Sequence, residues 1–214
     1  MFHRFRLQKA IKTKVPLDTD LKTCGIVILG NETRTEQSGR AYNWGYFMAH
    51  HHAHHGAPPP VDGTPKTNTF IGTDQADSFF GGKGTDFMYG GDGSDRLYGS
   101  SGRDQLTGGN GQDWLTGGSG NDTFFYNAAA DAGGPGSSDV IVDFQSGADH
   151  LDLHAFMAGG SFIGSAAFVA GAGAQVRYDA STGILSGDVN GDGTADFAIT
   201  MANHVVLAAV DFNF

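Results

Sequence analysis

Aspartates that recur every nine residues are the side chains of this sequence best suited to chemistry. Consecutive units start at Gly72, and position six of each of the six units is an aspartate: Asp77, Asp86, Asp95, Asp104, Asp113 and Asp122. Positions one, two and four are mostly glycine, which permits positive φ and lets backbone carbonyls turn toward a shared point. Oxygen ligands of this kind suit a hard cation such as calcium, so the sequence predicts metal sites along the repeat.

The distribution of charge supports the same interpretation. Residues 68–214 carry four Lys or Arg and eighteen acids, all of them aspartate, whereas residues 1–67 have a net charge of +4. The acidic part would repel phosphate, which argues against a nucleic-acid partner. The single cysteine, Cys24, excludes an internal disulfide. No apolar run approaches the roughly 18 residues of a spanning helix, so we expect no transmembrane segment.

Position eight of the unit sets the predicted fold, because it is always large and apolar: Phe79, Met88, Leu97, Leu106, Leu115 and Phe124. With side chains alternating along each short strand, position eight faces inward and two units make one 18-residue coil. We therefore predict an all-β protein built on a parallel β-roll of nonapeptide repeats. Burial of six side chains, at about 1.5–3 kcal/mol each, does not offset the ordering entropy of the repeat, so we expect it to be unfolded without cations.

The unit G-G-x-G-x-D-x-U-x resembles the repeat of RTX (hemolysin-type) calcium-binding proteins. The resemblance implies about four Ca²⁺ ions in the roll, each held between turns 18 residues apart. The implied aspartate pairs are Asp77 with Asp95, Asp86 with Asp104, Asp95 with Asp113, and Asp104 with Asp122. The implied carbonyl ligands come from positions two and four of the leading turn and one and three of the following turn: Gly82, Gly84, Gly90, Gly91, Asp92, Gly93, Gly99, Ser101, Gly102, Gly108, Asn110, Gly117 and Ser119.

Three residues depart from the glycine pattern. Thr73 and Gln75 stand at positions two and four of the first unit, and Ser100 stands at position two of the fourth. They must adopt glycine-like torsions or distort their turns, so we expect weaker sites there, above all between Asp77 and Asp95.

Residues 131–214 predict a β-rich cap after the roll, with strand-like runs at 140–142, 176–178, 197–199 and 205–207. The stretch SDVIVDFQSGADHLDLHAF, residues 138–156, resembles the segment that follows the β-roll in serralysin-type (M10) metalloproteases. The resemblance implies calcium-binding aspartates beside the end of the roll, and Asp131 and Asp139 occupy similar places. Residues 188–196 resemble the first part of an EF-hand loop without its last glutamate, and we favour a polar hairpin turn there.

The C-terminus, Asp211-Phe212-Asn213-Phe214, is an acid followed by hydrophobic residues that we expect to be exposed. Members of the family that leave the cell by the type I (ABC exporter) route end in a similar, uncleaved signal. The resemblance therefore implies a secreted, extracellular protein whose partner is the type I machinery and which folds where calcium is plentiful.

Residues 1–67 predict a largely irregular, basic leader and linker before a roll at 68–130. The cluster from His50 to His55 could bind a transition metal, although a polar tract beside a linker explains it better. The chain holds no H-E-x-x-H motif, and no glutamate follows Glu36, so we expect no enzyme activity.

Two alternatives stay open at this stage. The chain could be the non-catalytic C-terminal module of a secreted metalloprotease or polysaccharide-modifying enzyme. It could instead be a surface adhesin that uses the outward-facing Trp114 on a cell-surface or polysaccharide target.

Overall fold

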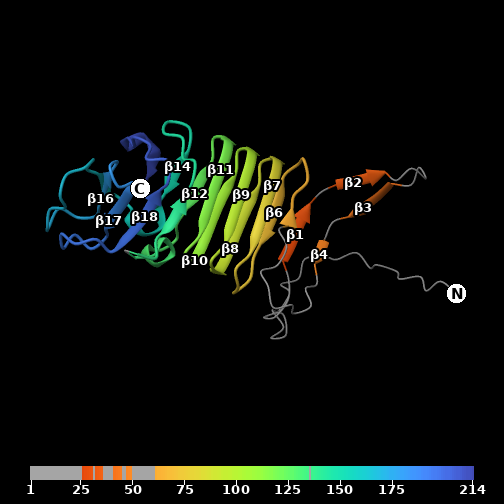
Figure 1. Ribbon diagram of the computed structural model, residues 1–214, viewed down its shortest axis with the longest axis horizontal. Coiled ribbons are helices and arrows are strands. Elements are labelled where there is room, and N and C mark those ends of the chain that lie inside the picture. The colour runs from red at the N-terminus through yellow and green to blue at the C-terminus, as the bar shows by residue number, and fades with distance from the viewer. Residues whose placement is uncertain (1–25, 31, 36–40, 45–46, 50–60, 135) are drawn as a thin grey trace.

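The computed structural model describes residues 26–30, 32–35, 41–44, 47–49, 61–134 and 136–214. Most of its strands form two facing sheets (Figure 1). The first sheet has the strand order β19 (Phe212–Asn213), β14 (His150–Asp152), β12 (Thr123–Phe125), β10 (Gln105–Gly111), β8 (Phe87–Gly93), β6 (Asn68–Ile71), β1 (Ile26–Gly30) and β4 (Phe47–Ala49). The second has the order β15 (Ser161–Phe162), β16 (Gln175–Asp179), β17 (Ile184–Asp188), β18 (Phe197–Met201), β13 (Asp139–Ile141), β11 (Trp114–Gly120), β9 (Arg96–Gly102), β7 (Ser78–Gly84) and β5 (Val61–Asp62).

A few short elements complete the described chain. The strands β2 (Glu32–Thr35) and β3 (Ala41–Trp44) form a separate antiparallel pair. Helical turns are η2 (Ala129–Ala132), α1 (His154–Met157) and η3 (Ala209–Asp211). No helix in the described ranges is long and apolar enough to cross a membrane.

Parallel pairing with a shift of 18 residues builds the roll. Leu106 of β10 lies beside Met88 of β8, and Leu115 of β11 lies beside Leu97 of β9. Successive nine-residue units therefore alternate between the two sheets, and each strand pairs with the strands two units before and after it. This arrangement confirms the predicted all-β fold with a parallel β-roll and a β-rich cap.

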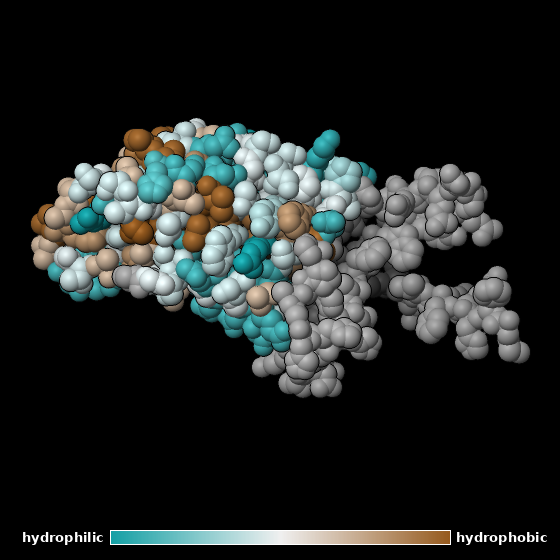
Figure 2. Space-filling view, in the orientation of Figure 1, coloured by the Kyte–Doolittle hydropathy of each residue, from teal (hydrophilic) through white to brown (hydrophobic). Residues whose placement is uncertain are grey.

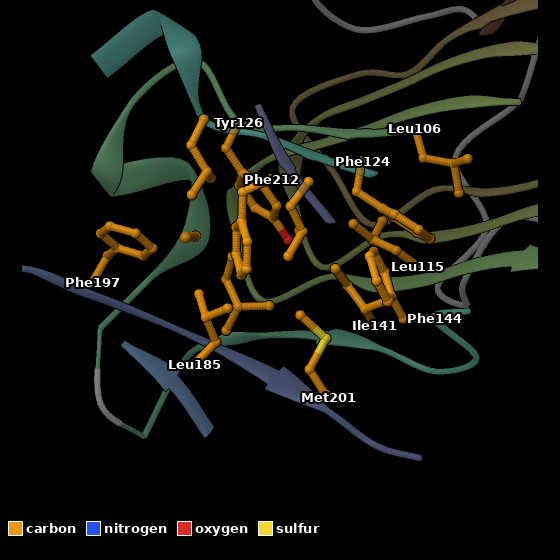
Figure 3. Packing of buried hydrophobic residues seen from close by; sticks show 14 of the residues in the cluster. Leu106, Leu115, Phe124, Tyr126, Ile141, Phe144, Leu185, Phe197, Met201 and Phe212 are labelled. Carbon is orange, nitrogen blue, oxygen red and sulfur yellow. The ribbon is translucent and has the colours of Figure 1, made fainter. Parts of the chain in front are cut away.

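The core of the roll is a row of stacked apolar side chains between the two sheets. All six position-eight residues are fully buried, as is Phe70 in β6, which precedes the first predicted unit. Beyond the repeats the row of buried side chains continues with Ile141, Leu151 and Met201. Figure 3 shows this end of the core, where the ring centroids of Phe124 and Phe144 are 5.8 Å apart. Each unit thus contributes one large apolar side chain, and the coils stack along the axis that is horizontal in Figure 1.

The roll starts earlier than the six-unit count suggests. Gly63 to Ile71 has the same layout as the repeats, with glycine first, Asn68 at position six and the buried Phe70 at position eight. β5 pairs in parallel with β7, and β6 with β8. The sequence signal was the spacing of Gly63 and Phe70, which the missing aspartate obscures.

The cap prolongs both sheets and seals the end of the roll. β13 and then β18 extend the second sheet in parallel, while β14 and then β19 extend the first. β16, β17 and β18 form an antiparallel meander beyond them. Figure 2 shows hydrophobic residues gathered mostly over this cap, whereas the face of the repeats seen there is largely white to teal.

Two expectations about the tail are wrong. Residues 205–207 form no strand. Leu207 is buried and Val206 is 77% exposed, so this irregular segment packs on the core through the Leu207 side chain. The C-terminal hydrophobics are not exposed as a group, because Phe212 lies in β19 with only 9% exposure and its ring stacks with those of Phe162 and Phe214. Asp211 is fully buried and accepts hydrogen bonds from Gly147 N at 2.7 Å and Ser146 Oγ at 2.8 Å.

Part of the leader joins the first sheet, although the sequence predicts mostly irregular chain there. β1 pairs antiparallel with β6 and with β4. The His50–His55 cluster lies outside the described residues.

Candidate metal centres along the turns

The position-six aspartates form two ladders along the edges of the roll, where the strands meet the turns. One carboxylate oxygen, Oδ1, of each aspartate from Asp86 to Asp122 accepts a hydrogen bond from the backbone N–H of the position-six residue 18 positions earlier. Asp77 N donates to Asp95 at 2.7 Å, and Asp95 N donates to Asp113 at 2.8 Å. These bonds fix the carboxylates and confirm that residues 18 apart meet, as the sequence predicts.

The second carboxylate oxygen, Oδ2, is buried and has no hydrogen-bond partner in five of the repeats and in one residue beyond them: Asp86, Asp95, Asp104, Asp113, Asp122 and Asp139. An anionic oxygen removed from water without a donor costs several kcal/mol, so such atoms mark places where a positive group is required. Six such oxygen atoms along the two edges of the described roll indicate a repeated cation position.

Glycine at position one creates the space that faces Oδ2. A Cβ on Gly90 would lie 2.2 Å from Asp95 Oδ2 and 2.5 Å from the carbonyl oxygen of Gly108. The carboxylate and the carbonyl of the next turn therefore converge on one small volume. The same holds for Gly99, where Asp104 Oδ2 and the Gly117 carbonyl oxygen would lie at 2.5 and 2.6 Å. Carboxylate and carbonyl oxygens converging in this way fit a hard divalent cation.

The glycine positions serve different purposes, which corrects one expectation. Positions two and four have positive φ, for example 109° at Gly91 and 129° at Gly93. Position one does not, and its glycine is required by the space described above. Ser100, at position two of the fourth unit, adopts φ of 80°, as the glycine pattern demands.

The first unit departs from the others. Thr73 donates to Asp77 Oδ2 through its backbone N–H at 2.7 Å and through its hydroxyl at 3.0 Å. Thr73 and Gln75 are absent from the positive-φ residues of the described chain, so this turn has a different path. Because the protein itself satisfies Asp77, the space beside it has less need of a cation.

Beyond the repeats, the two candidate aspartates differ. Asp139 is fully buried, accepts a hydrogen bond from Asp113 N at 2.9 Å and so continues the ladder. Asp131 instead accepts from the backbone N–H groups of Asn127 and Ala128, at the start of η2. Asp149, which sequence reasoning missed, continues the other ladder by accepting from Asp122 N at 2.9 Å.

Asp149 could have been found from the sequence. Asp149-His150-Leu151 and Asp139-Val140-Ile141 both repeat the aspartate-x-apolar triplet of positions six to eight. Before Asp149 only the position-four glycine, Gly147, is kept, and before Asp139 positions two and four are not glycine, which is why the phase is lost.

Burial makes the ionised carboxylates unfavourable. Removal from water raises the pKa of Asp95 and Asp104 to about 7, that of Asp113 and Asp122 to about 6, and that of Asp139 to about 8. The like charges of neighbouring aspartates raise these pKa values further. A bound cation would reverse this effect, since it stabilises the charged form.

The other predicted ligand residues lie in the turns that carry these carboxylates. Positions two to four continue the parallel ladder, with Gly91 beside Gly109 and Asp92 beside Asn110. Among the described residues no three His, Cys, Asp or Glu side chains converge, so any site here would combine few carboxylates with backbone carbonyls.

Two further features singled out from the sequence are the loop 188–196 and Trp114. In the loop 188–196, Asp188 accepts from Gly191 N at 2.7 Å and Gly193 N at 2.7 Å, and Asp196 accepts from Val189 N at 2.7 Å. This is the polar hairpin turn favoured from the sequence. On the outer face of the second sheet, the Trp114 ring lies 5.2 Å from the guanidinium carbon of Arg96.

Comparison with known proteins identifies the context of this roll. The family described as "Peptidase M10 serralysin C terminal" matches residues 77–213. Over 90 residues the chain is 37% identical to Metallopeptidase AprA of Pseudomonas marginalis, a match that covers 41% of this chain and 19% of that protein. The chain thus spans about a fifth of that curated relative.

Two solved structures from the mannuronan C5-epimerase of Azotobacter vinelandii are also similar. The AlgE6R3 subunit has 26% identity and a TM-score of 0.45, over 74% of this chain and 86% of its own. The AlgE6R2 subunit has 25% identity and a TM-score of 0.34, over 73% and 92%. On the family match, which includes the position-six aspartate of all six repeats and no catalytic domain, this chain belongs to the serralysin C-terminal family of the M10 peptidases.

Proposed function

We propose that this chain is a calcium-binding module of a secreted protein, in which Ca²⁺ drives folding of the β-roll. The observation that carries the proposal is the row of six buried Oδ2 atoms without a hydrogen-bond partner in the described roll. Left ionised and alone, these carboxylates oppose folding at neutral pH. Paired with a divalent cation they favour it, so folding and metal binding are one equilibrium.

Asp86, Asp95, Asp104 and Asp113 would each supply Oδ2 to one ion, together with carbonyl oxygens of the glycine turns. The position-one carbonyls of Gly99, Gly108 and Gly117 are favoured by the convergence described above. Calcium bound there supplies positive charge and a preference for six to eight oxygen ligands. Asp122 and Asp139 would extend the same arrangement, whereas Asp77, satisfied by Thr73, would hold the weakest site.

The experiment that tests this function is far-UV circular dichroism of the full chain in excess chelator, followed by titration with calcium to about 10 mM. We expect a cooperative gain of β signal that equal magnesium does not reproduce, since Mg²⁺ demands a smaller, near-octahedral site. A β spectrum that chelator leaves unchanged would refute a calcium-driven fold.

We also propose that the C-terminus serves type I secretion. This is supported by membership of the serralysin C-terminal family and by the terminal sequence from Asp211 to Phe214. In this scheme the chain stays unfolded where calcium is scarce, and β19 with its buried Phe212 packs only after export. Expression in a bacterium with a type I exporter should place the protein in the medium, and deletion of residues 211–214 should retain it in the cell.

A second candidate is that the roll acts as the non-catalytic part of a larger secreted enzyme. The similarity to a short part of Metallopeptidase AprA favours it. Replacing the matching part of that protein by this chain should then preserve calcium-dependent release of proteolytic activity into the medium. Loss of secreted activity, with the hybrid retained in the cell, would count against it.

A further inference from the structure

The first coil of the roll is closed by the chain itself, unlike all later coils of the repeat. Its first unit comprises Gly63 to Ile71, and the position-six residue of this unit is Asn68 rather than aspartate. Asn68 is fully buried, and its backbone N–H donates to Asp86 Oδ1 at 2.7 Å, which is the ladder bond of every later coil. The asparagine therefore takes the structural place of an aspartate without the charge.

The side-chain amide nitrogen of Asn68 lies among four oxygen atoms. It donates to Asp86 Oδ1 at 2.9 Å, to the Thr64 carbonyl at 3.2 Å, to the Gly81 carbonyl at 3.4 Å and to the Lys66 carbonyl. An amide has only two hydrogens, so four acceptors are more than it can satisfy with good geometry. An excess of converging oxygens is the environment of a cation.

These oxygens occupy defined positions of the repeat. Thr64 and Lys66 are positions two and four of the leading turn, Gly81 is position one of the following turn, and Asp86 is the aspartate 18 residues on. They are the positions from which the later coils are proposed to bind calcium. The amide carbonyl, Asn68 Oδ1, is satisfied separately by Thr64 N at 3.2 Å and Thr64 Oγ1 at 2.9 Å.

We infer that the amide nitrogen of Asn68 takes the place of a calcium ion in the first coil, so that this coil closes without metal. The inference rests on the proposed calcium-binding function of the later coils. In those coils the equivalent Oδ2 atom, such as that of Asp104, has no hydrogen-bond partner.

The other edge of the roll begins in a similar way. There the backbone N–H and hydroxyl of Thr73 satisfy Asp77 Oδ2, again with protein donors. Both edges thus start with a turn closed by the chain itself, and the unpartnered carboxylates begin one coil later, at Asp86 and Asp95. The first coil then offers a preformed surface on which the metal-dependent coils stack.

The test is a count of bound calcium per full-length chain at saturating calcium, by equilibrium dialysis and metal analysis. Asn68→Asp restores the carboxylate and removes the two amide hydrogens, so it should bind one ion more than the wild type. Its folding in chelator should be weaker than that of the wild type. The matched control, Asn121→Asp, makes the same change at an exposed position five and should leave the count unchanged.

A second variant separates the donor role from packing. Asn68→Ala leaves the same oxygens without donor or ion, so it should gain no calcium and should unfold roughly 5 °C lower at saturating calcium. An unchanged ion count in Asn68→Asp, or its failure to fold at saturating calcium, would overturn the inference. If the wild type binds no calcium at all, the proposed function fails instead, which keeps the two results distinct.

Discussion

Replacing Asp104 by asparagine should have opposite effects with and without calcium. Asp104 Oδ1 accepts the buried Asp86 N–H at 2.8 Å, and the amide oxygen of asparagine can do the same. The new amide nitrogen would replace the unpartnered Oδ2 and face the turn carbonyls, as in Asn68. The variant keeps the ladder, loses the charge and loses at least one calcium ion.

The size of the effect follows from the buried charge. Burial raises the pKa of Asp104 from 3.8 to about 7, which corresponds to about 4 kcal/mol of destabilisation by the ionised group above pH 7. We halve this to about 2 kcal/mol because charges at buried sites are screened more strongly than in a dry interior. In chelator at pH 8, Asp104→Asn should therefore raise the ratio of folded to unfolded chain roughly thirtyfold.

The assay is far-UV circular dichroism in chelator with increasing trimethylamine N-oxide, which favours compact states and brings a marginal fold into range. Asp104→Asn should fold at a lower osmolyte concentration than the wild type at pH 8. The advantage should shrink to about a quarter at pH 4.5, where the folded wild-type carboxylate is protonated but the unfolded one is still mostly ionised, and it should vanish below the unfolded pKa of 3.8. Asp74→Asn, the same change at an exposed site, is the control. The reasoning is refuted if Asp104→Asn is no more stable than this control at pH 8, or if its advantage does not shrink at pH 4.5.

Four further predictions concern the space at position one, the effect of pH on folding and on calcium affinity, and the core. Gly90→Ala places a methyl 2.2 Å from Asp95 Oδ2, so it should abolish one ion in dialysis and cost about 1–3 kcal/mol, whereas Gly134→Ala, in open space, should do neither. Acidification of the chelated protein from pH 8 to about 5 should increase its β signal in circular dichroism. The folded-state pKa values of about 6–8 lie above the unfolded value near 3.9, so stability without metal is lost as pH rises through that window. In calorimetry, calcium affinity should fall over the same acidification, because protons compete for the carboxylates; an unchanged affinity would contradict ligation by these groups. Leu97→Ala should lower the unfolding free energy in calcium by about 2–5 kcal/mol, and Val206→Ala by less than about 0.5, measured by urea denaturation.

The repeat itself could be predicted because each unit carries its own complete signal. Aspartate and an apolar residue at fixed spacing specify the parallel register, the row of buried residues and the contact between each carboxylate and the backbone 18 positions earlier. Local pattern suffices there because every coil contacts only its neighbours.

Prediction from the sequence was incomplete where the structure depends on contacts between distant residues rather than on the repeat pattern. Asn68 lacks the aspartate of the repeat, yet its amide nitrogen bonds to four separate residues. These bonds depend on the folded turns and cannot be recognised from the unit's sequence. Asp149 keeps only the position-four glycine, Gly147, of the turn before it, and the burial of Phe212 depends on β14, which lies some 60 residues upstream. Residues 205–207 have strand-like composition but no neighbouring strand in the described chain to pair with.

Because the nine-residue units alternate between the two sheets, an odd or even number of units decides which sheet of the cap the leader strands share. β1 and β4 of the leader extend the same sheet as β14 and β19 of the cap, because an odd number of units separates β6 from β12 along the chain. Loss or gain of two units would shorten or lengthen the roll and preserve this relation. Loss of a single unit would turn the cap by half a coil, so that the leader strands would share a sheet with β13 and β18 instead. Repeat arrays of this kind can therefore change length freely only in steps of 18 residues if both ends are to keep their relative orientation.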